Sequence, residues 1–244
     1  MQNKRIIPCL DIKDGRTVKG INFLEVKDAG NPMEMVRKYC ADGADELVLL
    51  DITATVEKRK TLLKLVKEIA QEITIPFTVG GGINSLDIAR EVLEAGANKV
   101  SINSAAVHWP ELITELAQKF GKQSVVVAID TKFKNDQWKV LTHGGSIMTT
   151  LNIIDWAKEI EALGAGEILL TSMNKDGTKN GFSLDITKQV AEAVSIPVIA
   201  SGGAGTMDHF KKVFEKTKAT GALAASVFHY GEITIPTLKK YLNQ

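Results

Sequence analysis

Eight short apolar runs recur along this chain, and the distances between them repeat. The runs end near Asp11, Asp51, Gly80, Asn103, Asp130, Ser172, Gly202 and Ser226. The intervals between these ends are 40, 29, 23 and 27 residues, followed by 42, 30 and 24. Because the second set follows the first closely, one half-unit occurs twice, over about residues 1–121 and 122–244.

The content of the unit decides between a solenoid, two tandem domains and a barrel. Runs such as residues 47–50 and 197–200 are continuously apolar, as parallel strands covered on both faces are. The stretches between the runs have helical spacing, as at Leu112, Leu116 and Phe120. Eight strand–helix pairs predict a single (β/α)8 TIM barrel of the α/β class, because each parallel crossover needs a connection of helix length. The 244 residues match that barrel and leave little room for a second domain.

Composition argues against several classes of function. The formal net charge is +1, and the 30 basic and 29 acidic residues are interspersed, so there is no basic stripe for nucleic acid. No apolar stretch approaches the roughly 20 residues of a membrane span. The first residues lead into a short strand rather than a signal-peptide core. We therefore expect a cytoplasmic protein with neither a nucleic-acid nor a membrane partner.

The two cysteines predict no chemistry of their own. Cys9 lies inside a predicted strand and Cys40 on a predicted helix, without a CxxC pair or a cluster of histidines and cysteines. Buried, inert thiols are the favoured interpretation. Neither a metal site nor a cofactor is expected.

Two glycine tracts follow the third and seventh predicted strands. Residues 78–83 read TVGGGI, and residues 200–205 read ASGGAG. Consecutive glycines let a ligand approach the backbone and let several N–H groups turn toward one anion. About 20 residues later a helical stretch begins, at Asn103 and Ser104 in the first half and at Ala225 and Ser226 in the second. Since a helix N-terminus favours phosphate, each half contains a candidate phosphate site.

Glycines at such positions also serve tight strand-to-helix turns that bind nothing. Two tracts at equivalent positions, both followed by a polar helix start, favour phosphate binding. Sites after strands three and four lie across the barrel mouth from sites after strands seven and eight. The expected ligand is therefore an elongated small molecule with a phosphate at each end.

Asp11 and Asp130 end strands that lie opposite each other in the predicted barrel. One carboxyl can accept a proton while the other supplies one, provided that their surroundings separate the two pKa values. The alternative is that each aspartate caps the following turn, a role that fits Asp51 well. Lys19 lies in residues 13–23, which we expect to form a long, mobile loop over the mouth. It either pairs with ligand anions or remains a solvated loop lysine.

Four charged residues each begin a predicted strand at the opposite end of the barrel: Arg5, Glu46, Lys99 and Glu167. Two acids and two bases should therefore ring the closed end. Arg5, Ile7, Cys9 and Asp11 share one face at period two, over roughly 20 Å at about 3.3 Å per residue. From the residues alone, a plug of salt bridges that seals the barrel floor is the favoured interpretation.

Five segments together are similar to one known family. They are CLDIKDGR at residues 9–16, LDITA at 50–54, FTVGGGI at 77–83, GAGEILLTS at 164–172 and ASGGAG at 200–205. In this order and spacing they resemble the cyclase subunits of imidazole glycerol phosphate synthase. The resemblance extends over nearly the whole chain, and a generic barrel would not carry all five segments.

The resemblance implies a lyase of histidine biosynthesis. Such enzymes combine ammonia with a phosphoribulosyl formimino aminoimidazole carboxamide ribonucleotide, which carries a phosphate at either end. The products are imidazole glycerol phosphate and aminoimidazole carboxamide ribonucleotide. The resemblance further implies that Asp11 and Asp130 act as general base and acid, and that Lys19 belongs to a loop that closes over substrate. The residues implied to hold or orient the two ends are Gly82, Asn103 and Ser104 for one, and Asp176, Gly177, Gly203, Ala225 and Ser226 for the other.

Family members take ammonia from a glutaminase subunit that docks on the opposite rim of the barrel. For this chain the resemblance therefore implies a heterodimer, and it changes the interpretation of the four charged residues from a plug to an ammonia gate. Asn98 and Asn174 stand where family members often have aspartate, a departure that concerns communication with the glutaminase rather than cyclisation. The chain ends at Gln244, before the Gly-Ile/Val-x-Val-Arg tail that is common in the family.

Two other functions remain open at this point. One is the sugar-phosphate isomerase of the same pathway, which shares the half-barrel repeat, the paired aspartates and the bisphosphate ligand. Lys19 and the charged floor argue against it, because an isomerase needs no entry for ammonia. The other is a barrel that binds phosphates or a partner without catalysis, against which the two intact aspartates argue.

Overall fold

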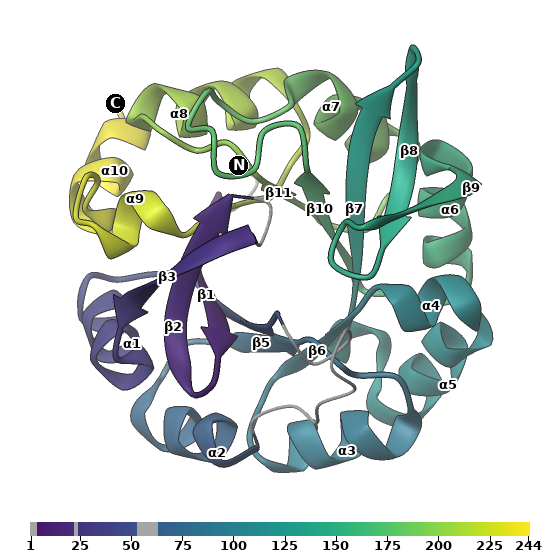
Figure 1. The fold of residues 1–244 in the computed structure, drawn as a ribbon, viewed down its shortest axis with the longest axis horizontal. Coiled ribbons are helices and arrows are strands. Elements are labelled where there is room, and N and C mark those ends of the chain that lie inside the picture. Colours follow the sequence, from purple (N-terminus) through teal and green to yellow (C-terminus); the bar gives the residue numbers. More distant parts are fainter. Residues whose placement is uncertain (1–3, 22–23, 53–62) are drawn as a thin grey trace.

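The structure is a closed barrel of eight parallel strands surrounded by helices (Figure 1). The computed structural model describes residues 4–21, 24–52 and 63–244. The barrel strands are β1 (Arg5–Lys13), β4 (Leu47–Asp51), β5 (Phe77–Gly80), β6 (Lys99–Ile102), β7 (Val125–Lys134), β10 (Glu167–Ser172), β11 (Val198–Ser201) and β12 (Gly221–Ala224). Each pairs in parallel with the next, and β12 pairs with β1 to close the ring. The predicted TIM barrel is confirmed.

The connections between the strands supply the outer layer of helices, as parallel crossovers require. These helices are α1 (Pro32–Ala41), α2 (Leu63–Glu72), α3 (Leu86–Glu94), α4 (Ser104–His108), α5 (Glu111–Phe120), α6 (Ile153–Ala162), α7 (Leu184–Ala193), α8 (Met207–Lys216), α9 (Ser226–His229) and α10 (Ile235–Leu242). A short 3-10 turn, η1 (Lys122–Ser124), precedes β7. Corresponding helices begin alike: the side chains of Asn31 and Asn152 cap α1 and α6, each accepting from two backbone N–H groups.

Alternate residues of the strands build two separate cores. On β1, Ile6 and Leu10 belong to the large core that includes helix residues, whereas Ile7 and Cys9 belong to a smaller core with Leu169 and residues of other strands. Because successive side chains of a strand point to opposite faces, the smaller core fills the barrel interior. Each fully buried Leu or Ile side chain stabilises the fold by about 1.5–3 kcal/mol.

Two antiparallel hairpins extend the barrel wall at its mouth. β2 (Arg16–Ile21) and β3 (Leu24–Gly30) follow β1, and β8 (Gln137–Thr142) and β9 (Ile147–Asn152) follow β7. Both reversals use two consecutive residues with positive φ, at Asp14 and Gly15 and at Asn135 and Asp136. Such two-residue turns match the twist of the paired strands.

The prediction of a long loop over residues 13–23 is therefore wrong. β1 continues to Lys13, and residues 16–21 form β2, because the Asp14-Gly15 pair makes a tight hairpin turn. Lys19 lies in β2, where its backbone is opposite Lys27 of β3. The last two residues of the predicted loop, 22 and 23, lie outside the described residues.

Candidate active site at the barrel mouth

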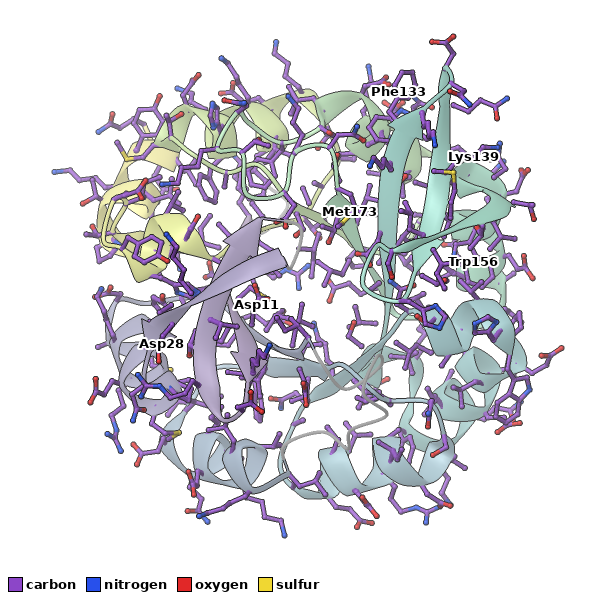
Figure 2. The ribbon with its side chains drawn as sticks, in the orientation of Figure 1. Asp11, Asp28, Phe133, Lys139, Trp156 and Met173 are labelled. Atoms are coloured by element: carbon purple, nitrogen blue, oxygen red, sulfur yellow. The ribbon has the colours of Figure 1, made fainter. Side chains whose placement is uncertain are left out.

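Asp11 and Asp130 lie on opposite walls of the barrel, as predicted. Asp11 is on β1 and Asp130 on β7, and the closed strand order places three strands between them on either side. Both residues are buried, with 2% and 8% of their surfaces exposed. Asp11 lies within the ring of helices in Figure 2. Each strand continues into its hairpin, so both carboxyls are held by a rigid wall rather than by a flexible strand end.

The surroundings of Asp130 favour the protonated form of its carboxyl group. Burial raises the pKa of Asp130 to about 7, and the negative charge of Asp176 adds to that effect. A hydrogen bond from Asn103 Nδ2 to Asp130 Oδ2, 2.9 Å long, acts in the opposite direction by favouring the carboxylate. A carboxyl that is protonated in part of the molecules at pH 7 is suited to general acid chemistry.

Asp11 has a different neighbour. The thiol of Cys9 donates to Asp11 Oδ1 at a sulfur–oxygen distance of 3.6 Å, and both residues are buried inside the barrel. The prediction of a buried thiol is confirmed for Cys9. It is wrong for Cys40, which lies on α1 at the edge of the main core and is only partly buried.

A pocket at the mouth brings together all five residues that were predicted for the second phosphate. It is lined by Asp11 and by Asp176, Gly177, Gly203, Ala225 and Ser226. Gly203 has φ +102°, and a Cβ there would lie 2.2 Å from Gly181 O. Glycine is therefore the residue that fits where the loop after β11 meets the loop after β10.

Several other residues line this pocket, and three of them, Ser201, Gly202 and Ala204, belong to the glycine tract at residues 200–205 that the sequence indicated. The pocket residues that sequence reasoning did not single out are Thr171 and Lys179, together with the apolar residues Leu50, Leu169, Leu223 and Ala224. Thr171 is the last residue but one of β10, and Ser201 is the last residue of β11, so a hydroxyl side chain near the end of each strand was a usable signal. Lys179 carried no such signal, since it belongs to an irregular loop and forms an ion pair with Glu232 at 2.5 Å.

The residues predicted for the first phosphate do not line that pocket. Gly82 lies in the loop after β5 with φ +67°, while Asn103 and Ser104 lie at the start of α4. The hydroxyl of Ser104 accepts a hydrogen bond from His143 N at 2.9 Å, so its own O–H remains available to a ligand. Asn103 Oδ1 is buried without a hydrogen-bond partner among the described residues.

The two halves nevertheless have the same backbone geometry where these helices begin. Asn103, before α4, has φ −130° and ψ −85°, and Ala225, before α9, has φ −122° and ψ −77°. The side chain of Lys19 lies outside the described part of the structure, so its contact with ligand anions stays a prediction.

At the opposite end of the barrel the four predicted charged residues form one closed ring. Arg5 Nη1 donates to Glu46 Oε2 at 2.9 Å, and Arg5 also bonds Glu167 and the hydroxyl of Thr220. Lys99 Nζ donates to both oxygens of Glu46, at 3.0 and 3.1 Å, and to Glu167 Oε2 at 2.7 Å. The glutamates are nearly inaccessible, and burial without these partners would be costly.

The ring fixes the charge state of its arginine. Burial alone would lower the pKa of Arg5, but the hydrogen bonds and negative charges of Glu167 and Glu46 outweigh burial and raise it. Between this ring and Asp11 the interior is filled by apolar side chains such as Ile7, Cys9 and Leu169. The geometry predicted for the floor is thus present, and its use as a gate stays a prediction.

Both asparagines that depart from the resembled family form backbone contacts here. Asn98 Oδ1 accepts from Phe77 N at 2.9 Å, next to the charged ring. Asn174 Oδ1 accepts from Phe133 N at 2.7 Å, at the mouth.

Within residues 4–21, 24–52 and 63–244, no group of three or more His, Cys, Asp or Glu residues is arranged to hold a metal ion. Among the helices in those same ranges, none combines the length and the apolar composition of a membrane span.

Comparison with known proteins identifies the family. The family model described as "Histidine biosynthesis protein" matches residues 5–234. Proteins called "Imidazole glycerol phosphate synthase subunit HisF" are 58% identical in Hydrogenobaculum sp. (strain Y04AAS1) and in Cytophaga hutchinsonii, and 56% identical in Geobacillus thermodenitrificans. Each alignment covers all of this chain and 97–98% of the relative. The chain therefore belongs to the histidine biosynthesis protein family, among the HisF subunits of imidazole glycerol phosphate synthase.

Proposed function

We propose that this protein is the cyclase of imidazole glycerol phosphate synthase and that Asp11 and Asp130 carry its proton transfers. The substrate is the phosphoribulosyl formimino aminoimidazole carboxamide ribonucleotide, and the second reactant is ammonia. The observation that carries the proposal is the pair of buried carboxyls on opposite walls of one mouth, in a full-length homologue of HisF subunits.

The two carboxyls divide the proton chemistry. Asp130 is the acid, since burial and the charge of Asp176 keep its pKa near 7. Its carboxyl can therefore donate a proton to a leaving group or to a hydroxyl that is lost as water. Asp11 is the base, and the Cys9 thiol orients one of its oxygens. Amination, elimination and ring closure each need a proton removed on one side of the substrate and supplied on the other, which suits opposed groups.

The two ends of the substrate occupy the two halves of the mouth. Gly177, Gly203, Ala225 and Ser226 surround one phosphate with backbone N–H groups, and Asp176 orients that end. The residues for the other phosphate are Gly82, Asn103 and Ser104, with Lys19 closing from β2. The matching backbone geometry before α4 and α9 supports equivalent anion sites in the two halves.

Ammonia enters from the floor. In water at neutral pH most of it is present as ammonium, so a protected route from a glutaminase subunit preserves the reactive form. Arg5, Glu46, Lys99 and Glu167 gate that route, and the subunit docks on the same rim. Support comes from the closed ring of ion pairs at the start of the strands, opposite the aspartates.

An assay with the ribonucleotide and ammonium at alkaline pH, with and without a glutaminase subunit, tests the proposal. The wild-type protein should turn over substrate with ammonium alone and should use glutamine once the subunit is added. Asp11→Asn should abolish turnover while substrate binding stays within a few-fold, because the amide keeps the size of the carboxylate and loses the base. Unchanged turnover in Asp11→Asn would remove that residue from the mechanism.

The same assay separates the alternatives. A sugar-phosphate isomerase would convert its substrate without ammonia, and a non-catalytic barrel would bind the ribonucleotide without turnover. The HisF relatives, similar over their full length, favour neither alternative.

A further inference from the structure

One side chain, that of Asn174, fastens the loop after β10 to the β7–β8 hairpin. Its Oδ1 accepts from Phe133 N at 2.7 Å, and its Nδ2 donates to Phe133 O at 3.4 Å. β7 and β10 pair as parallel strands as far as Thr131 and Ser172. The carboxamide therefore continues the ladder at a point where the main chain has already left it.

The main chain leaves the ladder in order to form the second phosphate site. Met173 N makes the last backbone bond to β7, to Thr131 O at 2.8 Å, and then Asp176 N turns back to Ser172 O at 2.9 Å. Asp176 and the next residue, Gly177, line the pocket. Figure 2 shows Met173 nearer the centre of the barrel than Phe133, which lies toward the outer end of β7. Asn174 thus reaches outward while the residues after it return to the mouth.

We call the two hydrogen bonds between the Asn174 side chain and the Phe133 backbone the tether. The tether depends on the length of β7. In the first half, Ile52 N donates to Ile12 O at 3.2 Å, the counterpart of the bond from Met173 to Thr131. There β1 ends at Lys13 and reverses at once. β7 instead continues to Lys134, so the backbone groups of Phe133 stand beside the loop and can bind a side chain.

We propose that Asn174 is a positioning residue that holds the 173–177 loop on the β7–β8 hairpin, with Asp176 and Gly177 arranged to receive one end of the substrate. The inference deepens the proposed function and rests on it. In this chain the carboxamide offers a donor and an acceptor together, whereas an aspartate in the same place would direct a second acceptor at Phe133 O.

The position of Asp176 also matters to the acid. The negative charge of Asp176 contributes to the raised pKa of Asp130, after the larger effect of burial. A loop that moves would change both the grip on the substrate and the surroundings of Asp130.

Two variants of Asn174 separate the two bonds, and a third variant is a matched control. Asn174→Ala removes both bonds, and Asn174→Asp keeps the acceptor and loses the donor. Asn180→Ala truncates an exposed asparagine further along the connection between β10 and α7. With saturating ammonium, Asn174→Ala should raise the KM for the ribonucleotide about three- to tenfold, as the loss of one or two hydrogen bonds predicts, and lower kcat less than twofold. The KM of Asn174→Asp should lie between that of Asn174→Ala and that of the wild type. The KM of Asn180→Ala should equal that of the wild type.

Amide hydrogen exchange supplies a readout that does not depend on turnover. The Phe133 amide should exchange at least tenfold faster in Asn174→Ala than in the wild type, and it should stay protected in Asn180→Ala. An unchanged KM in Asn174→Ala, or an equal rise in Asn180→Ala, would overturn the proposal. Absence of turnover in the wild type would instead refute the proposed function. In that case the amide exchange rates of Phe133, Asp176 and Gly177 would still test the tether. Unchanged rates in Asn174→Ala would refute it.

Discussion

At the scale of single residues, this protein buries a carboxyl group in surroundings that disfavour its ionised form. Asp130 is buried beside the charge of Asp176, and both surroundings favour the protonated form. A hydrogen bond from Asn103 to Asp130 opposes them. A group held in this way is useful as an acid near pH 7, and it costs stability wherever it must ionise inside the barrel.

Asp130→Asn should therefore stabilise the protein at alkaline pH while it abolishes cyclisation. Because the pKa of Asp130 is about 7 in the folded state and about 4 in the unfolded chain, the folded state binds more protons between these values. The free energy of unfolding of the wild type should fall as pH rises through this window. At pH 8 the variant should gain on the order of 1–3 kcal/mol over the wild type. Urea unfolding of both proteins at pH 5 and pH 8 measures this, and equal pH dependence would contradict it.

At the scale of elements, glycines and hairpins shape the mouth. The sequence indicated the glycine tracts and the helix starts directly, since both are local patterns. It did not indicate the two hairpins, because the apolar periodicity of a barrel strand hides the antiparallel strands that follow it. The Asp14-Gly15 turn was a usable signal for the first hairpin. No such dipeptide marks the second, where Asn135 and Asp136 adopt positive φ.

Gly203→Ala tests the tract after β11. The new Cβ would lie 2.2 Å from Gly181 O in a backbone with φ +102°, so the loops around the second phosphate must separate. We expect the KM for the ribonucleotide to rise on the order of tenfold, and kcat to change less. Gly43→Ala is a suitable control, because Gly43 also has positive φ but has open space around its Cβ position. A similar KM in both variants would show that the tract does not shape the site.

At the scale of the whole molecule, the barrel separates two groups of charges along its axis. The aspartates occupy the mouth, and the ring of Arg5, Glu46, Lys99 and Glu167 closes the floor. The apolar interior lies between them. This arrangement keeps the chemistry of the mouth apart from the rim on which we propose that the glutaminase docks.

Lys99→Met should destabilise the protein while ammonium-dependent cyclisation continues. The change leaves Glu46 and Glu167 buried with Arg5 as the remaining cation of the ring. Removing one partner of a buried ion pair typically lowers the free energy of unfolding by about 3–5 kcal/mol. Denaturant unfolding measures the loss, and Lys212→Met, which breaks an exposed ion pair with Asp208, is the control. Equal stability of Lys99→Met and the wild type would show that the ring contributes nothing to the fold.

Asn98→Asp tests communication with the glutaminase. Aspartate keeps the acceptor for Phe77 N and adds a negative charge on the rim. We expect stronger stimulation of the glutaminase and no change in ammonium-dependent cyclisation, since the mouth lies at the other end of the barrel. If glutaminase activity in the complex is the same with either residue, this position does not limit the stimulation.

The sequence by itself determined the barrel, its eight strands and the positions of the paired aspartates and glycine tracts. These features follow from apolar periodicity and from spacing along the chain, both of which can be recognised in short stretches of sequence. Only the tertiary structure decided that Asp176 lies near enough to raise the pKa of Asp130, that Asn174 binds Phe133 and that four charges from different strands form one ring. Such contacts join residues tens of positions apart. Their geometry depends on how strands are registered around a closed barrel, which no local pattern specifies.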